Sequence, residues 1–142
     1  MRLKYTKLQI ALETIGFLLF VGMIAFVFTQ WDQLPQQIPA HYNAKGKIDS
    51  WGDKNVLLHV LALSIFIYML ITLFSFLPKT WNIPAQVPEE NKEKVYQYTM
   101  NLMVLVKVEV LALISCSIYY TATIQTMPIM LVPISLLAIS FE

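Results

Sequence analysis

The residues with the most versatile chemistry lie in one polar stretch, LPQQIPAHYNAKGKIDSWGDK, at positions 34–54. His41, Asn43 and Asp49 carry nitrogen and oxygen atoms that donate or accept hydrogen bonds. If the chain brings them together with Asp53 and His59, they also match the ligands that divalent metal ions take in proteins. Three interpretations are therefore open: hydrogen bonds within turns and caps, contact with a partner, or a metal site.

His41 is the residue of this stretch that local structure explains least. Turn chemistry accounts for Asn43 and Gly46, at the first and last positions of NAKG. His41 instead lies in an extended flank, where an ordinary strand-forming residue would serve the backbone equally well. We therefore assign His41, Asn43, Asp49 and Trp51 to a partner-binding surface, and we predict no metal and no cofactor there.

Three further charged residues lie inside long apolar segments. They are Glu13, Lys107 and Glu109. A charge within a membrane is costly unless it is paired or hydrated, so the simplest arrangement pairs Glu13 with Lys107 between two helices. Residues two apart do not share a helix face, so Glu109 must point elsewhere. The pair either holds helices together or contributes to an ion or proton path, and both interpretations stay open.

Long uncharged segments must position these side chains. The 142-residue chain is 57% apolar and only 13% charged. Runs of about 18 or more uncharged residues are typical of membrane spans. We predict spans at about 8–30, 56–77 and 95–123, and a fourth, short segment at 127–141. The whole chain, 1–142, is interpreted as a single membrane domain.

A cap is predicted between the first two spans, at 31–54. Pro35 and Pro39 favour extended backbone and oppose helix. IPAHY and KIDSW can then pair as a small hairpin, with Pro35, Pro39, Gly46 and Gly52 as structural turn residues. Aromatic residues at the membrane interface would anchor this cap. These anchors are predicted to be Trp31, Tyr42 and Trp51.

The distribution of basic residues gives an orientation. Most of them lie in the N-terminal segment and in the loop at 78–94, namely Arg2, Lys4, Lys7, Lys79, Lys92 and Lys94. The cap holds only Lys45, Lys47 and Lys54. Basic residues are enriched on the cytoplasmic side of membrane proteins. The N-terminus and the loop at 78–94 are therefore predicted to be cytoplasmic, and the cap extracytoplasmic.

The polar stretch also resembles a known motif, LP-x-x-IP-x-H-x-N-x-x-G-x-x-D-x-x-G, of a bacterial membrane domain of unknown function. The matching residues are Leu34, Pro35, Ile38, Pro39, His41, Asn43, Gly46, Asp49 and Gly52. This domain is similar to the one that opens SdpI-type immunity proteins, which protect their producers from a secreted toxin. The resemblance covers the first two spans and the cap, and it implies a multi-pass protein of the bacterial cell membrane.

The sequence thus predicts an all-α integral membrane protein with three to four spans and a hairpin-like cap. Its net charge of +1 provides no basic surface for nucleic acid. Its partners are expected to be the lipid bilayer and either a secreted peptide toxin or another membrane protein. The expected function is non-enzymatic protection against a membrane-active peptide. A small transporter or channel-like subunit and a metal-dependent membrane enzyme are the alternatives.

Overall fold

The computed structural model describes residues 4–83 and 86–131, which form three long helices and one β-hairpin. The helices are α1 (Lys7–Gln30), α2 (Val56–Ser75) and α3 (Glu89–Ala122). The antiparallel hairpin between α1 and α2 consists of β1 (Gln37–Tyr42) and β2 (Ile48–Asp53). Single 3-10 turns lie at Trp31–Gln33, Pro78–Thr80 and Ile129–Leu131. The predicted fold class, helical spans with a hairpin between the first two, is confirmed.

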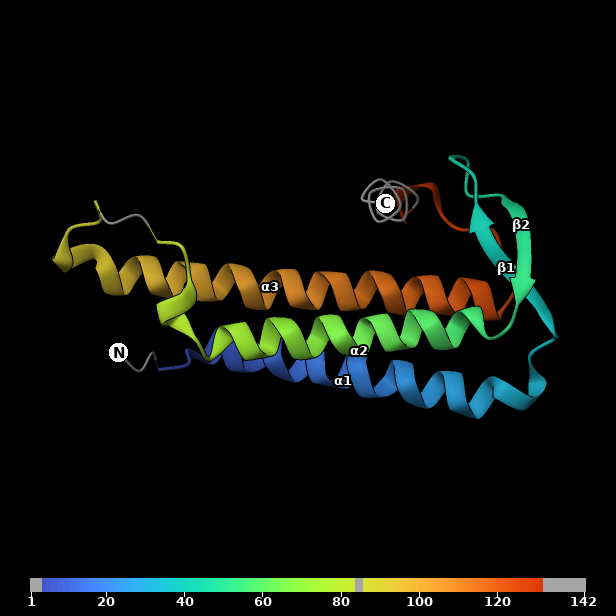
Figure 1. Cartoon of the computed structure of the whole chain (residues 1–142), viewed down its shortest axis with the longest axis horizontal. Helices are drawn as coiled ribbons and strands as arrows, with labels where there is room; N and C mark the ends of the chain where they lie inside the picture. Colours follow the sequence, from blue (N-terminus) through green and yellow to red (C-terminus); the bar gives the residue numbers. More distant parts are fainter. Residues whose placement is uncertain (1–3, 84–85, 132–142) are drawn as a thin grey trace.

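The three helices run side by side as one long bundle, with the hairpin at one end (Figure 1). Helix α1 begins near the opposite end, where α3 extends beyond the other two helices. Helix α3 packs against both α1 and α2. Residues of α1 and α3, which are far apart in the sequence, therefore lie side by side along the bundle.

The outer surface of the bundle is strongly apolar. Large side chains such as Phe17, Phe28 and Phe66 are each more than half exposed, at 52%, 64% and 62%. Water-soluble proteins rarely expose continuous apolar surface on this scale. Each of the three helices is long and apolar enough to cross a membrane. The bundle is therefore compatible with a multi-pass membrane protein whose outward side chains contact lipid.

The main apolar core lies in the half of the bundle next to the hairpin. It joins Met23 and Val27 of α1 to Leu57 of α2 and Ile118 of α3. Ile38 of β1, which is fully buried, belongs to the same cluster. Because a strand residue shares the helix core, the hairpin is fixed to the bundle and does not hang from it as a free loop.

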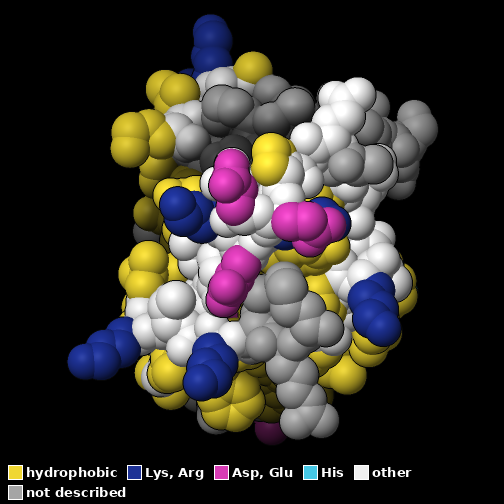
Figure 2. Space-filling model, turned by 90° about the vertical axis from the view of Figure 1, so that its left-hand side faces the viewer, with side chains coloured by type: hydrophobic (Ala, Val, Ile, Leu, Met, Phe, Trp, Pro, Cys, Tyr) yellow, Lys and Arg dark blue, Asp and Glu magenta, His cyan; other side chains and the backbone are white. Residues whose placement is uncertain are grey.

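Lysine, arginine and acidic side chains also gather at the other end of the bundle (Figure 2). Helix α3 begins there directly after Pro88, with Glu89 and Glu90 in its first turn. Negative side chains at this position interact favourably with the positive end of the helix dipole. Helix α1 begins nearby with a capping box, in which Thr6 and Gln9 exchange side-chain hydrogen bonds with each other's backbone N–H.

The chain turns back towards the hairpin after α3. Ile124 has a left-handed backbone with φ of 53°, and the N–H of Gln125 donates to the carbonyl of Tyr120 at 3.0 Å. The N–H of Met127 then donates to the carbonyl of Gly46 at 2.9 Å. This bond ties the chain after α3 to the hairpin turn. The fourth segment predicted at 127–141 lies largely outside the described residues.

Candidate functional site

The hairpin turn has the geometry that the NAKG sequence predicts. The N–H of Gly46 donates to the carbonyl of Asn43 at 2.9 Å, and Gly46 has a φ of 74°, a region that favours glycine. The side-chain oxygen of Asn43 accepts from the N–H groups of Lys45 and Lys47 at 2.9 and 3.1 Å. Asn43 is thus occupied within the turn, and its assignment to a partner-binding surface stays a prediction.

His41 and Asp49 form a pair across the two strands. Nδ1 of His41 lies 2.6 Å from Oδ1 of Asp49, so the ring donates to the carboxylate. The two side chains are 41% and 40% exposed, so solvent and any partner can reach them. The pair lies beside an irregularity in the strand register, because His41 pairs with Ser50 whereas Pro39 pairs with Trp51. Ala40 in β1 and Asp49 in β2 are the unpaired residues of two successive register shifts, and regular pairing resumes at Tyr42 and Ile48.

Two of the four predicted turn residues lie elsewhere than expected. Gly46 is in the turn and Pro35 is in the connection that precedes β1. Pro39 and Gly52, however, lie within β1 and β2. Pro39 is buried, so its apolar ring serves packing. A Cβ on Gly52 would lie 3.0 Å from the Cβ of Ala40, so this glycine permits close contact between the strands.

The three aromatic residues expected at the membrane interface differ in exposure. Trp51 is 52% exposed, as an anchor or a contact residue requires. Trp31 is partly covered by Lys54, whose ammonium lies 4.7 Å from the ring centroid and donates to the carbonyl of Trp31. The prediction for Tyr42 was wrong, because this side chain is only 7% exposed and packs with Met127. Its position in β1 turns it towards the bundle.

The other candidate metal ligands are used locally. Asp53 accepts from the side chain of Gln36 and from the N–H of Asn55 at 2.8 Å. Nδ1 of His59 lies 2.9 Å from the carbonyl of Asn55, one turn earlier in the same helix. Within residues 4–83 and 86–131, no three His, Cys, Asp or Glu side chains are close enough to hold a metal ion. The metal-enzyme alternative therefore gains no support from the hairpin.

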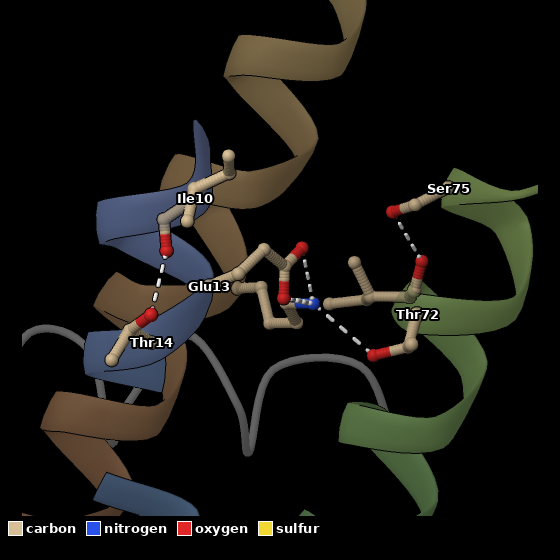
Figure 3. A network of polar contacts seen from close by, with 7 residues as sticks. Ile10, Glu13, Thr14, Thr72 and Ser75 are labelled. Carbon is tan, nitrogen blue, oxygen red and sulfur yellow. Dashed lines mark hydrogen bonds and ion pairs between the residues drawn. The ribbon is translucent and has the colours of Figure 1, made fainter. Parts of the chain in front are cut away.

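Glu13 and Lys107 form the expected pair, and it joins all three helices (Figure 3). The ammonium of Lys107 donates to both carboxylate oxygens of Glu13, at 2.8 and 2.6 Å, and to the hydroxyl of Thr72 at 3.1 Å. It also lies 5.2 Å from the ring centroid of Tyr68. The Lys107 side chain is fully buried, whereas that of Glu13 is 23% exposed.

A second polar layer lies one helical turn nearer the N-terminal end of α1. The side-chain NH₂ of Gln9, a fully buried residue, donates to Asn101 at 2.7 Å and to Gln97 at 3.1 Å. Gln97 in turn donates to the carbonyl of Lys4 at 3.2 Å. The α1–α3 interface therefore contains two polar layers, one at Gln9 and one at Glu13. The sequence analysis did not identify the layer at Gln9.

Glu109 lies on a different face of α3 from Lys107, as its spacing predicts. Its side chain is exposed, beside the exposed apolar residues Leu105 and Val106. In the described part of the chain it takes part in no ion pair. Glu109 and the Glu13–Lys107 pair are thus separate features, and the structure does not bring the three charges into one site.

Comparison with known proteins gives one match. Residues 18–65, about a third of the chain, are similar to a family described as "Domain of unknown function (DUF1648)". The match begins within α1, includes the whole hairpin and ends within α2. No curated protein and no solved structure matches the chain. The relation to SdpI-type proteins and the bacterial origin stay predictions.

Proposed function

We propose that this protein is a non-enzymatic membrane protein that binds a membrane-active peptide at its hairpin and thereby protects the membrane. The supporting observation is the exposed His41–Asp49 pair on a hairpin that is fixed to the helices. Both side chains are about 40% exposed and already ordered by their mutual hydrogen bond. A pre-ordered polar surface loses little side-chain entropy when a partner binds.

The neighbouring side chains match the chemistry of such a peptide. Asp49 and Trp51 are two residues apart in β2, and both side chains are exposed. A carboxylate beside an exposed indole offers attraction for cationic groups together with a large apolar contact. Peptides that attack membranes combine cationic and apolar residues. The hairpin surface, defined here as His41, Asp49 and Trp51, complements both.

The location of the hairpin supplies the means of protection. With the N-terminus in the cytoplasm, as the basic residues predict, the hairpin lies at the extracytoplasmic surface of the cell membrane. A secreted peptide would reach this surface before it inserts. Binding at the hairpin would hold the peptide at the interface and lower the amount available to span the bilayer. No covalent chemistry is needed for this role.

A survival assay tests the proposal. Bacterial cells with and without this chain are exposed to a panel of secreted membrane-active peptides, and surviving cells are counted at each dose. We expect the chain to raise the lethal dose of at least one peptide, with an Asp49→Asn variant of equal abundance giving less protection. Equal survival with and without the chain across the panel would contradict the proposal.

A small transport or channel-like role is the second candidate, and the Glu13–Lys107–Thr72 contact favours it. Buried charges in a membrane bundle are costly and often mark ion or proton pathways. The polar layer at Gln9 leads from the N-terminal end of the bundle towards this contact. Flux of protons or potassium ions into liposomes that hold the purified protein would support this role, provided that Lys107→Met abolishes it.

A further inference from the structure

A cavity of about 190 Å³ lies directly behind the hairpin surface. It is lined by β1, the first turns of α2, the last turns of α3 and Met127, and it is partly open to the surface. His41 lines its hairpin side. Most of its wall is apolar and comes from Pro39, Val56, Leu57, Val60 and Ile118. The cavity is therefore continuous with the surface on which a peptide would lie.

One polar group in the cavity wall lacks a partner. The Tyr42 side chain lines the cavity and is 7% exposed, yet in the described part of the chain its buried hydroxyl forms no hydrogen bond. Burial raises the pKa of this hydroxyl, and the Thr121 hydroxyl, which is close by but not in hydrogen-bond geometry, offsets part of the rise. Buried hydroxyls are nearly always hydrogen-bonded in native proteins, so one without a partner needs an explanation.

We propose that this cavity binds one aromatic side chain that carries a hydroxyl group, that is, a tyrosine of the bound peptide. That the phenol group belongs to a peptide rests on the proposed function. That a phenol group fits rests on the cavity itself. The hydroxyl of the bound ring forms the hydrogen bond that the Tyr42 hydroxyl lacks. The apolar wall of the cavity contacts the ring itself.

Size and polarity both support a phenol. An engineered apolar cavity of about 150 Å³ in another protein binds benzene, so the present volume holds a single ring with a substituent. A wholly apolar ring would leave the Tyr42 hydroxyl unsatisfied after binding. A ring with its own hydroxyl removes that penalty, and Ser117 and Thr121 add further hydroxyls to the wall.

The test uses p-cresol and toluene, the side-chain analogues of tyrosine and phenylalanine. The full chain is placed in lipid nanodiscs, and isotope-labelled methionine methyl groups are followed by NMR. Met127 is buried and lines the cavity, whereas Met130 is 84% exposed, does not line it and reports non-specific association. We expect the chemical shift of the Met127 methyl group to saturate as p-cresol is added. The chemical shift of Met130 should instead change linearly with p-cresol concentration.

Two pairs of comparisons make the result specific. Wild type should bind p-cresol roughly fivefold more tightly than toluene, and Tyr42→Phe should remove this preference, as expected for one hydrogen bond. Ser117→Leu should fill the cavity and abolish the saturable shift. Cys116→Leu is the matched control, because Cys116 is the exposed neighbour on the same helix and does not line the cavity.

A linear response at Met127 that parallels Met130 would overturn the proposal, as would equal affinity of the wild type for the two analogues. Val60→Phe fills the cavity from α2 and gives the decisive result if Ser117→Leu fails to fold. The outcome is distinguishable from that of the survival assay. Saturable p-cresol binding without any protection would refute the peptide-binding function but leave the phenol site in place.

Discussion

At the scale of single residues, the Glu13–Lys107 contact gives the most direct prediction. Glu13→Gln leaves the fully buried ammonium of Lys107 without its counter-charge, and breaking a buried pair in this way costs about 3–5 kcal/mol. Adding Lys107→Met removes the unpaired charge and should recover part of the loss. Thermal unfolding midpoints in detergent of wild type, both single variants and the double variant measure this coupling.

Strictly additive changes in the four midpoints would contradict the contact, because residues that do not touch behave independently. Thr72→Val in the otherwise wild-type chain separates the contribution of the Thr72 hydroxyl from that of the ion pair. Lys107 then loses one hydrogen bond of 3.1 Å but keeps its carboxylate partner. We expect a loss of about 1 kcal/mol, well below that of Glu13→Gln.

The ion pair was predictable from the sequence, but the groups around it were not. Two opposite charges in separate apolar spans leave few alternatives to pairing. Thr72 and Gln9 carry no such signal, because an uncharged polar residue in a helix often satisfies itself locally. Thr14, for example, bonds to the carbonyl of Ile10 in its own helix at 2.8 Å. Only the packing of α1 against α3 reveals which of these side chains reach across.

At the scale of elements, the hairpin turn depends on Gly46. A side chain at a φ of 74° costs about 1–2 kcal/mol, and a β-branched one costs more. Gly46→Val should therefore lower the amount of folded protein in the membrane fraction. Gly22→Ala is the control, because a Cβ at that position of α1 meets nothing within 4 Å. We expect it to stabilise the helix by about 0.5–1 kcal/mol.

A normal amount of folded Gly46→Val would show that the turn does not need its left-handed residue. The turn was predictable because Asn and Gly have fixed roles at its two ends. The direction of Tyr42 was missed, although Tyr42 lies four residues after Ile38 on the same face of β1 and both side chains are buried. Likewise, Gly52 has the appearance of a turn residue, but its role follows from contact with the opposite strand.

At the scale of the whole molecule, the orientation in the membrane is a prediction that one labelling experiment tests. Ala44 lies at the exposed tip of the hairpin turn. A cysteine placed there, in a Cys116→Ser background, should react with a membrane-impermeant thiol reagent on intact cells. Reaction only after the membrane is permeabilised would place the hairpin in the cytoplasm and remove the basis for its encounter with a secreted peptide.

The central claim is that the hairpin surface recognises a peptide, and His41→Ala tests it most directly. The measurement is cell survival at a peptide dose against which the wild-type chain protects, normalised to the abundance of each variant in the membrane fraction. His59→Ala is the matched control, because His59 is also exposed near the hairpin but its ring lies against the carbonyl of Asn55, the N-cap of its own helix. We predict that His41→Ala keeps normal abundance and loses protection while His59→Ala keeps both. Full protection by His41→Ala, or a loss of abundance as large as that of Gly46→Val, would contradict the account.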